Sequence, residues 1–263
     1  MYRFVSACAL LAACGDSGTT VDAQTYFDAR PDVAIDAPFT FNCATAPTAG
    51  THKLFLQFEG ATLTRGASDA VMNRFSGVAG SVSSATVPAW RATAPDRAAQ
   101  IHDVVCDIRE SMYPFDVEVV TTRPTFGDFD MIVFGGSFPD LGYAPSPGTF
   151  IFSLTTQDCN NANQRDVAWV TEHPSGADML TTIETANYAV AALGQDNGLG
   201  ASKSATNCMC NLFAGDFGSC NNTEVCKFSM TSEFKANGGN VCSRPGAIEN
   251  QVVRLYSLYG ARL

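Results

Sequence analysis

The sequence predicts an α/β (α+β) domain with a mixed, mostly parallel sheet and two main helices. A disulfide-rich, irregular part is expected to follow at the C-terminal end. Two observations predict this fold class. Short apolar, β-branched runs alternate along the chain with two longer segments of helical periodicity, the pattern of a sheet covered by helices. In addition, five of the 10 cysteines crowd into residues 208–242, where the composition is that of loops.

The first predicted strand covers residues 52–58 and is apolar at nearly every position, as in a strand buried on both faces. Residues 61–93 are rich in Ser, Thr, Ala and Gly and receive no assignment. A helix is expected to begin near Pro95-Asp96 and to end before Pro114. Its apolar residues recur at helical spacing, and Pro and Asp suit a first turn.

Four further short strands are expected at 117–122, 130–134, 150–152 and 167–170, because these runs are apolar or β-branched. The second helix is expected over 177–193, where apolar residues mark one buried side and Gly194 would end it. A terminal helix is expected over 248–259.

The N-terminus predicts export. Arg3 precedes a short apolar run, and the ending Leu11-Ala12-Ala13-Cys14 resembles the lipobox of bacterial lipoproteins. This resemblance implies that residues 1–13 are a lipoprotein signal peptide and that Cys14 carries the lipid. The chain would then be anchored to a membrane of the cell envelope, with Gly15 favouring the outer membrane or cell surface. An ordinary signal peptide is the alternative.

Residues 14–42 are predicted to be an acidic, flexible tether, because they hold five Asp and two Pro but few large apolar side chains. The folded domain is expected to span 43–263, with a Cys-rich C-terminal subdomain at about 201–245.

Eight cysteines remain after Cys8 leaves with the signal and Cys14 takes the lipid. An even number in an exported chain predicts disulfide bonds. Three precede the C-terminal group of five, so at least one bridge must join the two groups. A zinc site is less well supported, because Cys208-Met209-Cys210 is not a CxxC. The eight are Cys43, Cys106, Cys159, Cys208, Cys210, Cys220, Cys226 and Cys242.

The net charge and the number of histidines limit the partners and the metal or catalytic sites that this chain can have. The chain has 26 Asp+Glu against 16 Lys+Arg, which argues against a nucleic-acid partner. It has only 3 His, at positions 52, 102 and 173, and none forms an i, i+4 pair. Residues 158–166 offer oxygen donors for calcium but lack the EF-hand spacing. Asp128 and Asp130 alternate with Phe129, and we expect both to be solvated.

The order and texture of four segments resemble secreted zinc proteases of the metzincin type over roughly residues 52–200. The segments are the strand at 54–60, the long helix, the strand at 117–122 closed by Arg123-Pro124, and the strand at 131–136. In that family a second helix carries HExxHxxGxxH, whose His residues bind zinc and whose Glu activates the metal-bound water.

In this chain the corresponding helix contains none of those residues. The best register places Thr185, Ala189 and Gln195 at the His positions and Ala186 at the Glu position. The resemblance therefore implies a degenerate motif without zinc or another cofactor. A methionine turn follows the motif in the family, and Met209 or Met230 is its candidate counterpart; a core methionine is the alternative.

The leading hypothesis is a cell-envelope lipoprotein with a metalloprotease-like domain that has lost catalysis, a pseudoprotease. It would bind a peptide or protein ligand or act as a scaffold. One alternative is an active secreted metal-dependent peptidase with atypical ligands, which would require zinc. Another is a purely structural surface lipoprotein.

Overall fold

The computed structural model describes residues 41–144, 151–159, 161–174, 179–211, 220–233, 242 and 248–262. All of them belong to one unit, Phe41–Leu263. The predicted signal peptide, the lipidation site Cys14 and all of the predicted tether up to residue 40 lie outside the described residues.

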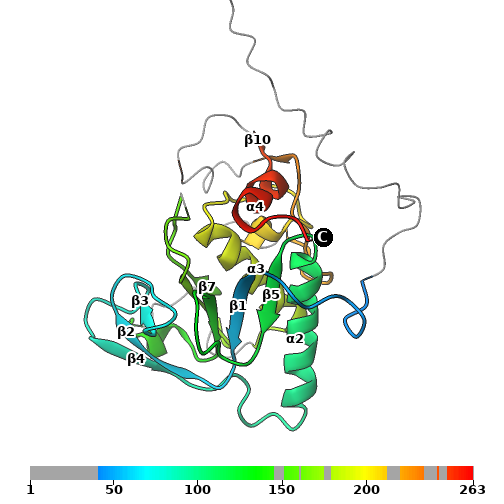
Figure 1. Cartoon of the computed structure of the whole chain (residues 1–263). Coiled ribbons are helices and arrows are strands. Elements are labelled where there is room, and N and C mark those ends of the chain that lie inside the picture. The colour runs from blue at the N-terminus through cyan, green and yellow to red at the C-terminus, as the bar shows by residue number, and fades with distance from the viewer. Residues whose placement is uncertain are drawn as a thin grey trace, which may run out of the picture. The chain divides into compact units, whose positions relative to one another are not determined.

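A five-stranded sheet forms the centre of this unit (Figure 1), and it confirms the predicted mixed, mostly parallel sheet. Four strands run parallel, and only the edge strand β7 is antiparallel to its neighbour. In spatial order the strands are β5 (Val117–Val120), β1 (His52–Gln57), β6 (Asp130–Phe134), β8 (Val167–Val170) and β7 (Ser153–Leu154).

Two long helices, α2 (Arg97–Met112) and α3 (Thr182–Asp196), match the two predicted ones. α3 begins later than the predicted residue 177, because the side chains of Thr181 and Glu184 form a capping box at its start. It also continues through Gly194, so the expectation that this glycine ends the helix is wrong. Two single 3₁₀ turns are η1 (Phe138–Leu141) and η2 (Cys208–Asn211).

Short strands account for much of the remainder. Residues 61–93, which received no assignment, form a separate sheet of β2 (Ala61–Arg65), β3 (Arg74–Phe75) and β4 (Ser84–Val87). The predicted terminal helix is helical only from Gln251, as α4 (Gln251–Tyr259). The strand before it, β10 (Ile248–Glu249), pairs with β9 (Ser232–Glu233). The strand expected at 150–152 is displaced to β7.

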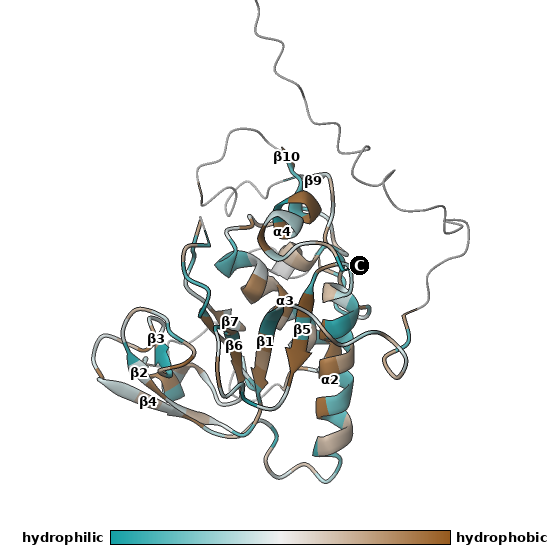
Figure 2. Ribbon diagram, viewed as in Figure 1, coloured by the Kyte–Doolittle hydropathy of each residue, from teal (hydrophilic) through white to brown (hydrophobic). Residues whose placement is uncertain are grey.

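The sheet is buried on both faces, which explains the continuous apolar run of β1. Leu54 and Leu56 pack in one core cluster with α2 and α3. Phe55, between them, packs in a second cluster with the small sheet. The layers are therefore helices, central sheet and small sheet. Figure 2 shows the hydrophobic residues concentrated on the central strands and on one side of α2.

Four disulfide bonds pair all eight predicted cysteines, and one of them joins the N-terminal three to the C-terminal five, as the cysteine count requires. The pairs are Cys43–Cys106, Cys159–Cys242, Cys208–Cys226 and Cys210–Cys220. The joining bond is Cys159–Cys242.

Candidate functional site

The four predicted motif positions in α3 do not form an open catalytic surface. Thr185, Ala186 and Ala189 are 0%, 1% and 0% exposed, and Gln195 is partly buried. The hydroxyl group of Thr185 donates a hydrogen bond to the carbonyl oxygen of Thr181, one turn earlier in the chain, at 2.8 Å. These positions therefore contribute to core packing, and Thr185 also hydrogen-bonds a backbone carbonyl group of its own helix.

Another face of α3 contacts the Cys-rich segment. The side-chain oxygen of Asn187 accepts a hydrogen bond from the backbone N–H of Cys226 at 3.1 Å, and its amide nitrogen donates to the carbonyl oxygen of Glu224. Two turns further on, a Cβ atom added to Gly194 would lie 2.3 Å from the sulfur atom of Met209. Met209 is fully buried there, whereas Met230 is 47% exposed.

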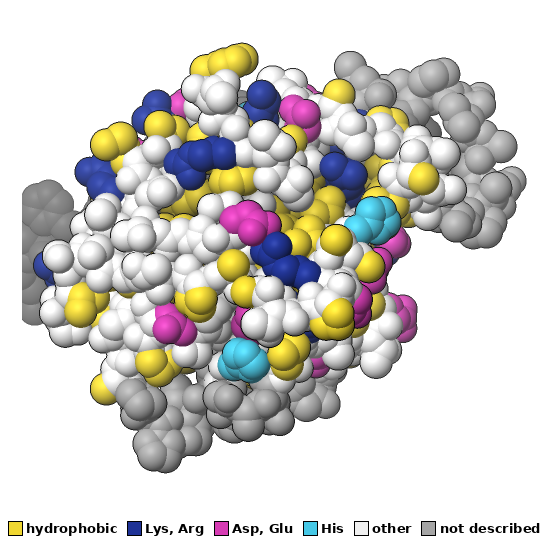
Figure 3. All heavy atoms as spheres, turned by 90° about the horizontal axis from the view of Figure 1, so that it is seen from below, with side chains coloured by type: hydrophobic (Ala, Val, Ile, Leu, Met, Phe, Trp, Pro, Cys, Tyr) yellow, Lys and Arg dark blue, Asp and Glu magenta, His cyan; other side chains and the backbone are white. Residues whose placement is uncertain are grey.

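The three histidines lie in three different places. His52 begins β1, and its ring packs edge-on against Tyr259. His102 is exposed on α2, and His173 follows the opposite, carboxyl end of β8, 3.5 Å from Glu172. Since β1 and β8 run in the same direction, His52 lies at the amino ends of the parallel strands and His173 at their carboxyl ends. On the face drawn in Figure 3, the visible histidine side chains also lie apart.

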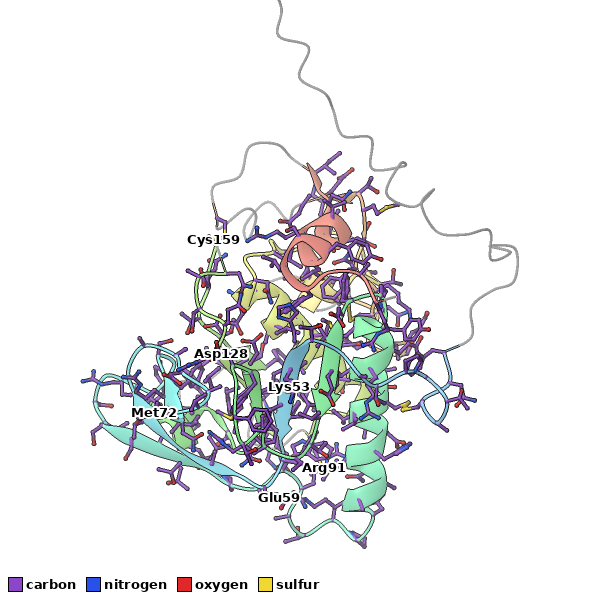
Figure 4. All side chains as sticks on the ribbon, in the orientation of Figure 1. Lys53, Glu59, Met72, Arg91, Asp128 and Cys159 are labelled. Carbon is purple, nitrogen blue, oxygen red and sulfur yellow. A yellow bond between two sulfur atoms is a disulfide. The ribbon has the colours of Figure 1, made fainter. Side chains whose placement is uncertain are left out.

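A pocket opens at the amino ends of the parallel strands. Its volume is about 250 Å³, and its walls combine acidic, basic and aromatic groups. Figure 4 labels Lys53 and Asp128, which both line this pocket. The charged and aromatic residues that line it include His52, Lys53, Asp128, Asp130 and Tyr259.

Asp128 and Asp130 differ in their surroundings, although both line this pocket. Asp128 is exposed and forms an ion pair with Arg165 at 2.6 Å. Asp130 is partly buried, and desolvation raises the pKa of its carboxyl group to about 6. The expectation that both would be solvated is therefore wrong for Asp130, because it is the first residue of a strand at the centre of the sheet.

Two further buried carboxyl groups stand behind Asp130. Burial, together with the charge on Asp130, raises the pKa of Asp166 to about 7. Burial and the charge on Asp166 also raise the pKa of Asp196 well above its ordinary value. Carboxyl groups that hold protons near neutral pH can exchange them with a ligand or with solvent. The three aspartates thus form a cluster of carboxyl groups whose pKa values are all raised.

The oxygen-rich loop at 158–166 is held together by its own hydrogen bonds. The backbone N–H of Asn163 donates to Asp158 at 2.7 Å, and its side-chain amide donates to Asp166 at 2.6 Å. Within the described ranges, no group of three or more His, Cys, Asp or Glu side chains is arranged to hold a metal ion.

The sequence did not indicate that Asp166, Asp196 and Tyr259 lie together, although a signal was present for one of them. Asp130 begins one predicted parallel strand and Asp166 immediately precedes another, so both belong to the same edge of the sheet. Nothing in the local sequence places Asp196 or Tyr259 beside them, because α3 and α4 reach this edge only through tertiary packing.

Comparison with protein-family models and with curated proteins found no match for this chain. None of the helices in the described residues has the length and apolar character needed to span a membrane.

Proposed function

We propose that the chain is a cell-envelope lipoprotein whose folded domain is a non-catalytic relative of the metzincin-type zinc proteases, with a binding or scaffolding role. The content of α3 carries this proposal. In the family the corresponding helix supplies the zinc-binding imidazoles and the catalytic carboxylate. In the register predicted from the sequence, Thr185, Ala186 and Ala189 fill those positions with groups that cannot bind zinc or activate water, and all three are buried.

The order of the elements supports the resemblance. A buried strand, a long helix and two parallel strands follow one another as β1, α2, β5 and β6, and a second long helix comes after β8. Both helices pack on the same face of the sheet. Because many unrelated functions share common folds, this order supports the family and leaves the function to the side chains.

We also propose a second register for the degenerate motif, which starts from Gly194, the one glycine in α3. With Gly194 at the motif glycine, the His positions fall on Asn187, Ala191 and Asn197, and the Glu position falls on Tyr188. The contact between Gly194 and the buried Met209 favours this register, since a methionine turn lies next to the metal-binding helix in the family. This register also lacks imidazole and carboxylate groups.

Metal analysis of the purified chain, with its cysteines oxidised, tests the loss of catalysis. We expect no stoichiometric zinc, no hydrolysis of a peptide library and no change in thermal unfolding after treatment with a chelator. Stoichiometric zinc that a chelator removes, with loss of peptide hydrolysis, would instead establish the active peptidase with atypical ligands.

A matched pair of variants in the same experiment distinguishes the two registers. One variant carries Asn187→His, Tyr188→Glu, Ala191→His and Asn197→His; the other carries Thr185→His, Ala186→Glu, Ala189→His and Gln195→His. We expect cobalt or zinc binding by the first alone, because Gly194 packs against Met209. Asn187 contacts Cys226, which is disulfide-bonded to Cys208 beside Met209. Metal binding by the second variant alone would support the register that starts at Thr185. Binding by neither folded variant would contradict the metzincin-like placement of α3.

A further inference from the structure

Three aspartates from three parts of the chain meet at the amino end of the parallel strands. Asp130 is the first residue of β6, Asp166 immediately precedes β8, and Asp196 is the last residue of α3. Asp166 and Asp196 are only 3% and 2% exposed. Among the described residues, no Lys, Arg or His side chain forms an ion pair with any of the three.

Neutral donors surround these carboxyl groups instead. Asp130 accepts a hydrogen bond from the backbone N–H of Asp166 at 3.0 Å, and Asp166 accepts one from the side-chain amide of Asn163. Asp196 accepts from the hydroxyl group of Thr155. Such donors do not balance three negative charges, and buried charges without a counter-ion are costly.

Tyr259 connects this cluster to the C-terminal helix α4. Its hydroxyl group donates to Asp130 at 3.4 Å and accepts from the amide of Asn197 at 2.8 Å. Tyr259 is 5% exposed, so α4 reaches the cluster through a buried side chain. A second side chain of α4, Arg254, donates to the carbonyl oxygen of Cys159 at 2.7 Å. Polar contacts near the cluster therefore help to hold α4 in place.

We propose that Asp130, Asp166 and Asp196 act as a proton-operated latch between the central sheet and α4. With protons bound, the three side chains stay packed beneath Tyr259. When the protons leave, repulsion drives Asp130 and Asp196 apart. The hydroxyl group of Tyr259 bridges Asp130 and Asn197, the residue after Asp196, so it can no longer keep both hydrogen bonds. α4 then loosens, and the pocket that Asp130 and Tyr259 line changes.

The direction of the pH effect follows from the raised pKa values. The closed state holds protons on Asp130 up to pH about 6 and on Asp166 up to pH about 7. The open state releases them near the ordinary aspartate value of about 4. The latch is therefore most stable below about pH 4, and its stability falls as the pH rises to about 7. Each carboxyl group favours opening about tenfold per pH unit within its own interval.

Other charged groups face the cluster from neighbouring elements, and their contribution to the pH dependence must be measured separately. His52 and Lys53 lie on β1, Arg254 lies on α4, and Asp158 lies in the loop before β8. Asp128 and Arg165 pair with each other at the surface. Histidine side chains commonly change charge between pH 5 and 8, so a His52→Gln variant is needed to separate that contribution.

Hydrogen exchange of the α4 backbone amides, measured from pH 4.5 to 7.5 on the full oxidised chain and corrected for intrinsic exchange, tests the latch. We expect protection in the wild type to fall at least about tenfold between pH 5 and 7. Asp166→Asn mimics the protonated group and should flatten this dependence. Asp128→Asn and His52→Gln should keep the wild-type dependence.

The same dependence in Asp166→Asn and Asp196→Asn as in the wild type would overturn the proposal. If these variants do not fold, carbon-13 NMR titration of the wild-type aspartates decides the question. Ionisation of Asp166 near neutral pH, in step with the loss of α4 protection, supports the latch. Ionisation at the ordinary aspartate value would refute it.

Discussion

Gly194 shows how a single missing Cβ atom can be required inside a helix. Glycine normally weakens a helix interior, yet α3 runs through this position to Asp196. The reason is tertiary: the sulfur atom of Met209 occupies the space where a side chain would begin. The local sequence predicts a helix end at Gly194, because the partner, Met209, is distant in the chain and no local pattern indicates the contact.

Gly194→Ala should therefore destabilise the fold by about 1–3 kcal/mol, the usual cost of overpacking a core, although alanine favours helices. The free energy of unfolding, measured in urea, checks this prediction. Gly66→Ala is the matched control, because its new Cβ would meet only a flexible arginine carbon at 3.5 Å. Equal stability of the two variants would show that Met209 moves aside without cost.

The elements differ in how well their sequence reveals them. The starts of β1, β5, β6 and β8 agree with the predicted ones, because each carries its own apolar or β-branched run. The strands of the small sheet were missed, since their alternation is brief and β3 has only two residues. Their burial depends on the central sheet, which a local pattern does not report.

The edge strand β5 shows a protective arrangement that also has no local signal. Its outward carbonyl groups at Val119 and Val117 accept hydrogen bonds from the guanidinium groups of Arg109 and Arg262. Charged side chains that cover an edge prevent it from pairing with another chain. One arginine comes from α2 and the other from the C-terminal end, so only the folded chain brings them to this edge.

The start of α3 could have been predicted from its local sequence, because Thr181 and Glu184 have the spacing of a capping box. The hydroxyl oxygen of Thr181 accepts from the backbone N–H of Glu184 at 3.2 Å, and the Glu184 carboxylate accepts from Thr181 N–H at 2.8 Å. Thr181→Ala should cost about 1 kcal/mol in the free energy of unfolding. Thr182→Ala, one residue later, is the control and should leave stability unchanged. Equal losses at both positions would contradict the assigned cap.

The disulfide bonds were predicted in number but not in pairing. The count of eight cysteines followed from export, and the need for a bridge between the two groups followed from parity. The partners are set by tertiary packing, which the sequence does not display. The candidate site was likewise predicted only in part. The absence of zinc-binding residues in α3 was visible in the sequence, whereas the aspartate cluster was not.

The disulfide bonds should differ in how much they stabilise the fold. Cys43–Cys106 closes a separation of 63 residues and Cys210–Cys220 one of 10. In the chain-entropy description, replacing the first pair with serine costs about 4 kcal/mol and the second about 3 kcal/mol. Urea unfolding of the two double variants measures both values. A larger loss for Cys210 and Cys220 would show that native packing, rather than loop closure, sets the effect.

The Cys43–Cys106 bond also has a mechanical consequence. β1 and the whole small sheet lie between these two cysteines, inside the covalent loop. A pull applied to the chain before Cys43 therefore passes across the sulfur bridge into α2 and bypasses residues 44–105. β1, which lies between β5 and β6 in the sheet, carries no tension while the bridge is intact. In a reducing environment the same pull would act on β1 first, and the sheet would open between β5 and β6.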